Sequence, residues 1–305
     1  MKETDVGGYR KAIDLYEKSL EAARRAGDVL GEGNALSNLA FSYMQLGQRR
    51  KAIDLGEEAL KIARSVGDAK GQGTNLGNMG LAYAGLGDYR RAIDFYEKAL
   101  EIARRVGDVR GEGSALGSEG AAWLHLGEYR KAIDVCEKAL KIDRRIGDVQ
   151  GEGIDLGNIG SAYIQLGEHR KAIDAFEKAL EIHRRIGDVQ YEGGDLGSLG
   201  YAYIQLGEYR KAIDACEKAA AIHGRIGEVQ GEGIDLGNLS YAYAQLGEYR
   251  KAIDAGEKAL KIDRRIGDMQ AEERDLGNLA YAYAHLGEYR KANELKEKAL
   301  EIRRR

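Results

Sequence analysis

The sequence has few of the features that mark several large classes of protein. Its only two cysteines, Cys136 and Cys216, lie 80 residues apart and cannot easily meet. We therefore expect them to be small buried apolar residues, as suits a reducing compartment, rather than a disulfide. No run approaches the roughly 18 apolar residues that a bilayer span needs, and the first ten residues, MKETDVGGYR, contain no apolar stretch. We expect no membrane contact and a cytoplasmic location.

An excess of positive charge is also missing. Lys and Arg total 47 against 50 Asp and Glu, which gives a formal net charge of -3. A nucleic-acid surface needs a clear basic excess or stripe, so we expect no nucleic-acid partner. The charged fraction of 32% is instead large enough to cover many exposed helix faces.

The sequence does contain a repeat. The stretch LGEYRKAID occurs at residues 126–134, 206–214 and 246–254, and near-copies begin at 46, 86, 166 and 286. Such an array is counted in units rather than in globular domains. The predicted boundaries are a partial repeat at 1–26 and seven forty-residue repeats at 27–66, 67–106, 107–146, 147–186, 187–226, 227–266 and 267–305.

The repeat at 147–186 has the pattern of two helices. Its first half places apolar or small residues at the spacing of one helix face: Leu156, Ile159, Gly160, Tyr163 and Leu166. We predict helix A at about 149–166, between an N-cap at Asp148 and a left-handed Gly167, and helix B ending at about 186, before Gly187. The link is so short that the two helices must form an antiparallel hairpin, whose apolar faces need a neighbouring repeat to cover them.

These residues carry a resemblance to a known family. The spacing of Leu156, Ile159, Gly160, Tyr163, Ala172, Phe176 and Ala179 is similar to that of the tetratricopeptide repeat. The family's terminal proline is missing and each unit is six residues longer, and the segments GDVQGEG and LGN resemble the Leu-Gly-Asn repeat (Pins-like) cell-polarity adaptors. The resemblance implies an all-α superhelical solenoid of one N-terminal orphan helix and seven helix-turn-helix units, with helix A on the concave wall.

A second stripe of residues runs beside the apolar face of each helix A, and the resemblance implies that it faces the groove. Asn or Ser holds one place in every repeat, where amides offer donors and acceptors to the backbone of an extended peptide. Tyrosines in the later repeats add flat contact area. The expected peptide-binding residues are Asn38, Phe41, Asn78, Leu81, Asn158, Gln165, Tyr201, Gln205, Asn238, Tyr241, Gln245, Arg274, Asn278 and Tyr281. The alternative is that Asn ties helix A to its neighbour and Tyr only shields the stack.

Catalysis and metal binding find little support. His183 and His223 share one place on helix B, with Asp143 and Asp263 at the same place in flanking repeats. Equivalent residues of successive hairpins should lie farther apart than the roughly 2 Å ligand distances of one ion allow. The GEG segment lacks the strand and the Lys-Ser/Thr of nucleotide-binding loops. We expect no enzyme, no metal and no cofactor.

Several departures from the repeat need an explanation. Glu119 stands at an apolar place, so we expect it to be partly hydrated or paired. Gly56 and Gly256 leave empty the place that Phe176 fills. A glycine precedes the Asn or Ser place of the stripe (the Asn row) in four repeats: Gly157, Gly197, Gly237 and Gly277. Each glycine lowers the stability of its helix. Close approach of the neighbouring A helix, or of a ligand backbone, would offset this cost.

The N-terminal helix has no partner helix A. Its apolar residues are Ile13, Tyr16 and Leu20. We expect this helix to leave one apolar face underused, and therefore either to pack on another copy of the chain, as a homo-oligomer, or to come from a longer array. The sequence favours a non-enzymatic scaffold that binds a protein or peptide segment in its groove; the alternative is a structural or self-assembling repeat module, natural or engineered, with no dedicated ligand.

Overall fold

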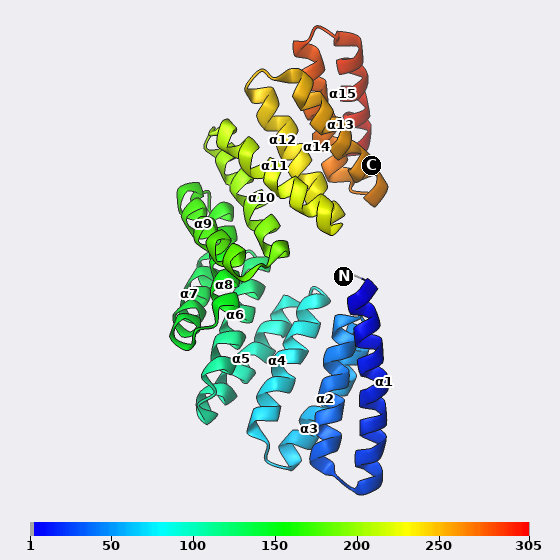
Figure 1. Ribbon diagram of the computed structural model, residues 1–305, viewed down its shortest axis with the longest axis vertical. Coiled ribbons are helices and arrows are strands. Elements are labelled where there is room, and N and C mark those ends of the chain that lie inside the picture. Colours follow the sequence, from blue (N-terminus) through cyan, green and yellow to red (C-terminus); the bar gives the residue numbers. More distant parts are fainter. Residues whose placement is uncertain (1–2, 305) are drawn as a thin grey trace. The chain divides into compact units, whose positions relative to one another are not determined.

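The computed structural model describes residues 3–304, and side chains from Gly7 onward; residues 1, 2 and 305 of the predicted terminal repeats lie outside this range. Residues 3–304 form fifteen α-helices and no strand (Figure 1). The bounds are α1 Glu3–Ala26, α2 Val29–Gln45, α3 Arg49–Ser65, α4 Ala69–Gly85, α5 Tyr89–Val106, α6 Val109–His125, α7 Tyr129–Ile146, α8 Val149–Gln165, α9 His169–Ile186, α10 Val189–Gln205, α11 Tyr209–Ile226, α12 Val229–Gln245, α13 Tyr249–Ile266, α14 Met269–His285 and α15 Tyr289–Arg303. The predicted all-α repeat class is confirmed. Within residues 3–304, no helix is both long enough and apolar enough to cross a membrane.

The helix ends follow the predicted capping chemistry. The backbone N–H of Gly151 donates to Asp148 Oδ1 at 3.0 Å, which satisfies one of the free donors at the start of α8. Gly167 and Gly187 adopt φ of 73° and 72°, a left-handed conformation that a side chain would strain. The predicted ends of both helices are therefore confirmed to within one residue.

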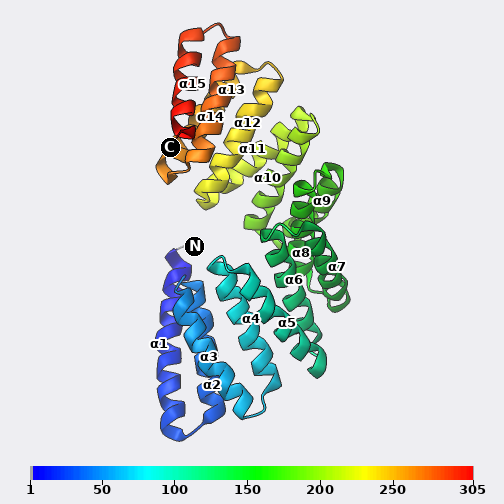
Figure 2. The same ribbon diagram turned by 180° about the vertical axis from the view of Figure 1, so that it is seen from behind.

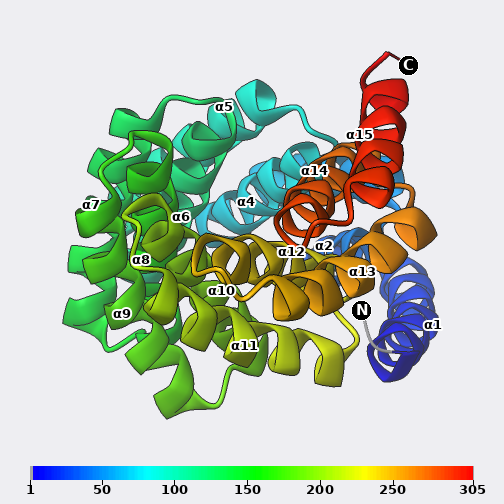
Figure 3. The same ribbon diagram turned by 90° about the horizontal axis from the view of Figure 1, so that it is seen from above.

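The chain divides into two compact units, residues 1–158 and 159–305, which are described separately. In each unit, odd-numbered (B) and even-numbered (A) helices alternate and pack antiparallel to their neighbours, as Figures 1 and 2 show from opposite sides. Even-numbered helices also approach one another: α2, α4 and α6 in the first unit, and α10, α12 and α14 in the second. Figure 3 shows α12 and α14 side by side. Among the helix pairs described within either unit, successive B helices do not contact one another. Successive A helices therefore lie closer together than successive B helices.

The two layers interlock through a small residue opposite a larger one. A Cβ on Gly160 would lie 2.9 Å from Cε2 of Phe176, which is 2% exposed. The same pairing, sixteen residues apart, joins Gly80 with Tyr96, Gly120 with Cys136 and Gly200 with Cys216. Both cysteines are free and 0% exposed, which confirms their predicted role as small buried residues.

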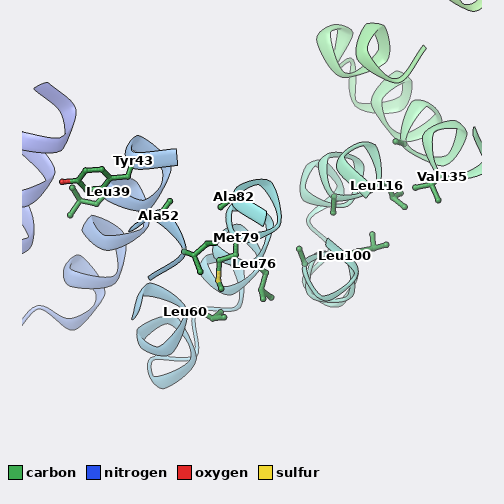
Figure 4. Packing of buried hydrophobic residues seen from close by; sticks show 14 of the residues in the cluster. Leu39, Tyr43, Ala52, Leu60, Leu76, Met79, Ala82, Leu100, Leu116 and Val135 are labelled. Atoms are coloured by element: carbon green, nitrogen blue, oxygen red, sulfur yellow. The ribbon is translucent and has the colours of Figure 1, made fainter. Parts of the chain in front are cut away.

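Glycine on helix B is compensated from the next helix A. A Cβ on Gly56 would lie 3.0 Å from Met79 Cγ, and a Cβ on Gly256 would lie 2.9 Å from Leu279 Cδ2. Met79 belongs to a core that continues through the first unit (Figure 4). Each helix pair therefore completes the core of its neighbour, as the repeat pattern predicts.

Helix α1 joins the same core. Ile13 is 7% exposed, and Tyr16 and Leu20 pack against the cluster that contains Leu39. The three apolar residues that the sequence left without a partner therefore contact the first full repeat. Among the side chains of α1 from Gly7 onward, Leu15 is a large apolar residue that is 65% exposed.

Glu119 is buried but paired, as expected. It is 8% exposed, and Trp123 Nε1, one helical turn later, donates to its Oε1 at 3.0 Å. Loss of solvent raises the pKa of the Glu119 carboxyl, and the hydrogen bond from Trp123 lowers it by less.

Gly160 and Gly277 provide substitutions with opposite expected effects. Gly160→Ala overpacks the contact with Phe176 and should lower the free energy of unfolding by about 1–3 kcal/mol. A Cβ on Gly277 meets nothing within 4 Å. Gly277→Ala should therefore raise that free energy by about 0.5–1 kcal/mol, because alanine loses less backbone entropy in a helix. Urea unfolding followed by circular dichroism measures both changes, and a shift of the same sign in both variants would contradict this packing.

The single tryptophan reports on the buried carboxyl. Because the pKa of Glu119 is raised, Trp123 fluorescence should titrate with a midpoint above the ordinary glutamic acid value of 4.5. Glu119→Gln keeps a hydrogen-bond acceptor without a titrating proton, and should remove this transition. A wild-type midpoint at or below 4.5, or a transition that persists in Glu119→Gln, would be inconsistent with the pairing.

Candidate functional site

Stacking brings equivalent residues of three A helices to one pocket in the second unit. The pocket has a volume of about 690 Å³. Six predicted site residues line it: Tyr201 and Gln205 of α10, Asn238 and Tyr241 of α12, and Arg274 and Asn278 of α14. Residues of this set on successive helices are 33 to 40 residues apart along the chain, so only the repeat geometry brings them together. The walls therefore carry amides, phenols and one guanidinium.

Arg274 is held in place from beneath the pocket. Its Nε donates to Oδ1 of Asp275 at 2.8 Å, and Asp275 is 0% exposed. A Cβ on Gly237 would lie 2.7 Å from Arg274 Nη2, so the glycine makes room for the guanidinium. This anchoring fixes the position of Arg274 while its side chain stays 42% exposed.

Two exposed tyrosines of the A helices contact aromatic rings of the preceding B helices. Tyr241 lies edge-on to Tyr209, with ring centroids 6.4 Å apart, and Tyr281 lies edge-on to Tyr249 at 6.5 Å. The His285 ring lies 4.4 Å from that of Tyr281. Loss of solvent raises the pKa of the Tyr241 phenol, with a smaller contribution from Tyr209. These contacts hold the rings while leaving 37% of Tyr241 and 42% of Tyr281 accessible.

The first unit has two smaller pockets on the same layer. One, of about 300 Å³, lies over α2, α3 and α4 and includes Asn34 and Asn38; the other, of about 190 Å³, includes Asn78, Leu81 and Ser118. Lys70 and Thr74 line both pockets, which therefore adjoin along α4. Glycine, serine and threonine residues are part of both linings, and both hollows are smaller than the pocket of the second unit.

The other predicted site residues are solvent-accessible but line none of these pockets. Phe41, Gln165, Gln245 and Tyr281 are exposed, and Asn158 is half-buried. None of the fourteen predicted residues is buried. The predicted stripe is therefore a surface feature, whereas its contact with a ligand stays a prediction.

The sequence analysis missed residues that come from outside the stripe. Tyr209 enters the pocket of the second unit from the start of a B helix. Asn75 lines the larger pocket of the first unit, is 3% exposed, and has a buried Oδ1 without a hydrogen-bond partner among residues 3–304. The recurring tyrosine of LGEYR was a signal for Tyr209; Asn75 has none, because its repeat equivalents are Ala or Asp.

The glycines beside the Asn row mark close approach of the neighbouring A helix. A Cβ on Gly197 would lie 2.7 Å from Asp235 Oδ1, and one on Gly237 would lie 2.8 Å from Asp275 Oδ1. The helix-packing explanation therefore holds at these two positions. It does not hold at Gly277, which has open space around it.

Comparison with known proteins identifies the family. Models of the tetratricopeptide repeat match residues 3–65, 31–105, 112–185 and 196–265, and related models match 78–145 and 276–305. A search of curated proteins gave no match.

Several solved structures share the fold. A signal-transduction ATPase with a tetratricopeptide repeat sensor, from Pyrococcus horikoshii, has 23% identity and a TM-score of 0.77 over 96% of this chain, which spans 45% of that protein. The apo form of RapI has 16% identity and a TM-score of 0.70, covering 90% of this chain and 98% of its own. A Rap protein complexed with competence and sporulation factor has 15% identity and a TM-score of 0.59, covering 98% of both chains. With family models matching along nearly its whole length, the chain belongs to the tetratricopeptide repeat family.

Proposed function

We propose that the chain is a non-enzymatic scaffold that binds a peptide or protein segment along its A-helix layer. One observation carries this proposal: within residues 3–304, the side-chain amides of the Asn row have no hydrogen-bond partner. These amides belong to Asn38, Asn78, Asn238 and Asn278. A role in tying one helix to the next would require such a bond. Accessible amides can instead hold the alternating donors and acceptors of an extended backbone.

The two units favour different side chains in the bound segment. Phe41 and Leu81 are 39% and 41% exposed in the first unit, beside pockets lined by small residues. They suit apolar side chains of modest size. In the second unit, Arg274 bonds Asp275 through Nε, which leaves its terminal donors for an acidic side chain between Tyr201 and Tyr241. The segment should therefore combine an apolar part with an acidic part.

The structural relatives support a partner-binding role. One Rap protein of this fold was solved in complex with competence and sporulation factor, and another relative carries the repeat array as a sensor. Side chains that are already held in place on the A helices lose little conformational entropy on binding, which favours the affinity of the scaffold for its partner.

A peptide library tests the proposal directly. Twelve-residue peptides displayed on phage are selected on the full chain, and their affinities are then measured by fluorescence anisotropy. The double variant Asn238→Ala/Asn278→Ala removes two amides, each contributing about 0.5–1.5 kcal/mol per hydrogen bond, so binding of acidic peptides should weaken by about 5- to 150-fold. The matched control, Asp214→Ala/Lys218→Ala, removes an exposed ion pair from α11 and should leave affinity unchanged. Failure to enrich any peptide, or equal affinity in the amide variant, would reject the proposal.

Self-assembly is the second candidate, favoured by the exposure of Leu15 on α1. If the chain self-assembles, its mass in solution should rise above the 33.4 kDa of one chain as the protein concentration increases. Leu15→Glu places a charge on that surface and should return the mass to the single-chain value. Light scattering coupled to size exclusion measures both proteins, and a constant 33.4 kDa for the wild type would exclude this candidate.

A further inference from the structure

A row of ionisable side chains is buried between successive repeats in the later part of the chain. Each pair joins a B helix to the next A helix, twelve residues on. The pairs are Asp143 with Asp155, His183 with Asp195, His223 with Asp235, and Asp263 with Asp275. All eight side chains are buried, with exposures from 0% to 7%. The same register in the earlier repeats holds Ala23 with Ala35, Ala63 with Asn75, and Ala103 with Ala115.

Two of the pairs are direct His–Asp contacts. His183 Nδ1 lies 2.6 Å from Asp195 Oδ2, and His223 Nδ1 lies 2.7 Å from Asp235 Oδ2. Each contact is a buried hydrogen bond between an imidazole ring and a carboxyl group of the next repeat. His183 Nε2 is buried and has no partner among the described residues, and the Tyr191 ring stacks at 4.9 Å.

The other two pairs consist of carboxyl groups alone. The charge of Asp275 acts on Asp263, and the charge of Asp143 acts on Asp155. One oxygen of each of three of these groups is buried without a partner among residues 3–304: Asp155 Oδ2, Asp263 Oδ2 and Asp275 Oδ2. Two adjacent carboxylates cannot both ionise cheaply out of water, so each pair retains a proton.

The glycines of the GEG segment form the niches for this row. A Cβ on Gly113 would lie 2.6 Å from Asp143 Oδ1, and one on Gly193 would lie 2.8 Å from His223 Nε2. On the other side, Gly151 faces Asp143 and Gly231 faces His223. The ionisable groups therefore press against bare helix backbone, which leaves little room to relax when their charge changes.

We propose that these four pairs make the joints between the later repeats sensitive to protons. A joint here is the packing of a B helix against the next A helix around one such pair. This packing is stable while the pair holds a proton and less stable when that proton leaves. The alanine-lined joints of the earlier repeats lack this response.

The charged groups around the pairs favour proton retention. Asp143 faces Asp148, which precedes α8, and Glu152 in the first turn of α8, and Arg110 of α6 opposes them. Asp148 also acts on Asp155, and Asp188 and Glu192 act on Asp195. Around the remaining pairs, Glu228 and Glu232 face His223, and Asp268 and Arg274 face both Asp263 and Asp275. Arg110 and Arg274 act against these acidic neighbours.

The direction of the pH dependence follows from the raised pKa values. Burial, then the neighbouring carboxylates, raise the pKa from 3.8 to about 6 for Asp143, about 7 for Asp263 and about 8 for Asp155. A group with a raised folded-state pKa contributes stability that is complete below its unfolded value and is lost as the pH rises through its folded value. The hydrogen bond to Asp235 also raises the pKa of His223, which acts in the same direction. The joints should therefore weaken as the pH rises from the unfolded value of 3.8 to about 8.

Thermal unfolding of the full chain at pH 5.5 and pH 8.5 tests the proposal. The wild-type midpoint should fall by about 5 °C or more at the higher pH. Asp155→Asn mimics the protonated carboxyl, so this variant should match the wild type at pH 5.5 and exceed it at pH 8.5. The double variant Asp143→Ala/Asp155→Ala places alanines at this pair, as at Ala103 and Ala115 of the preceding repeat, and should reduce the pH response. The control Asp134→Asn alters an exposed aspartate that pairs with Lys138 and should behave as the wild type.

Hydrogen exchange provides a readout that does not depend on a variant folding. After correction for the intrinsic pH dependence of exchange, amides of α7 and α13 should exchange faster at pH 8.5 than at pH 5.5, whereas those of α3 and α5 should not change. A wild-type midpoint that is equal or higher at pH 8.5, an Asp155→Asn variant that is less stable than the wild type there, or equal changes in early and late helices would each overturn the proposal.

Discussion

The structure depends on one packing constraint: a helix pair of this sequence cannot cover its own apolar surface. The empty place at Gly56 is filled by Met79 of the next repeat, and the one at Gly256 is filled by Leu279 of the next repeat. Neither contact exists without the neighbouring helix. Stability is therefore a sum of such joints rather than the property of one closed core, and the forty-residue step of the sequence becomes a fixed step in space.

That fixed step turns sequence positions into rows. Residues that lie beside the packing face of helix A occupy equivalent positions in every repeat. Asn238 and Asn278 therefore line one pocket although they are forty residues apart. The same rule places His223 against Asp235 in the interior. Surface row and buried row differ only in register, so the array can vary its surface chemistry and its joints independently, repeat by repeat.

The fold could be read from the sequence because periodicity, caps and glycine terminators all indicate the same helices. The interior pairs could not. Reading along helix B alone groups His183 and His223 with the aspartates of flanking repeats, as a possible metal row. Their actual partners lie on the next helix A, and which side chains of two helices meet depends on the rotation of each about its axis. That rotation is set by packing, not by spacing. For the same reason the sequence left α1 without a partner, whereas Ile13 reaches the first core.

The pocket and the buried row share one residue, which links them thermodynamically. Arg274 lines the pocket and bonds Asp275, so it offsets charge on the Asp263/Asp275 pair. Under the proposed function, a ligand carboxylate on the terminal nitrogens of Arg274 would share its positive charge, leave this pair less compensated and raise the affinity of the pair for a proton. Linkage is reciprocal, so a proton on the pair would strengthen the binding of an acidic segment at Arg274.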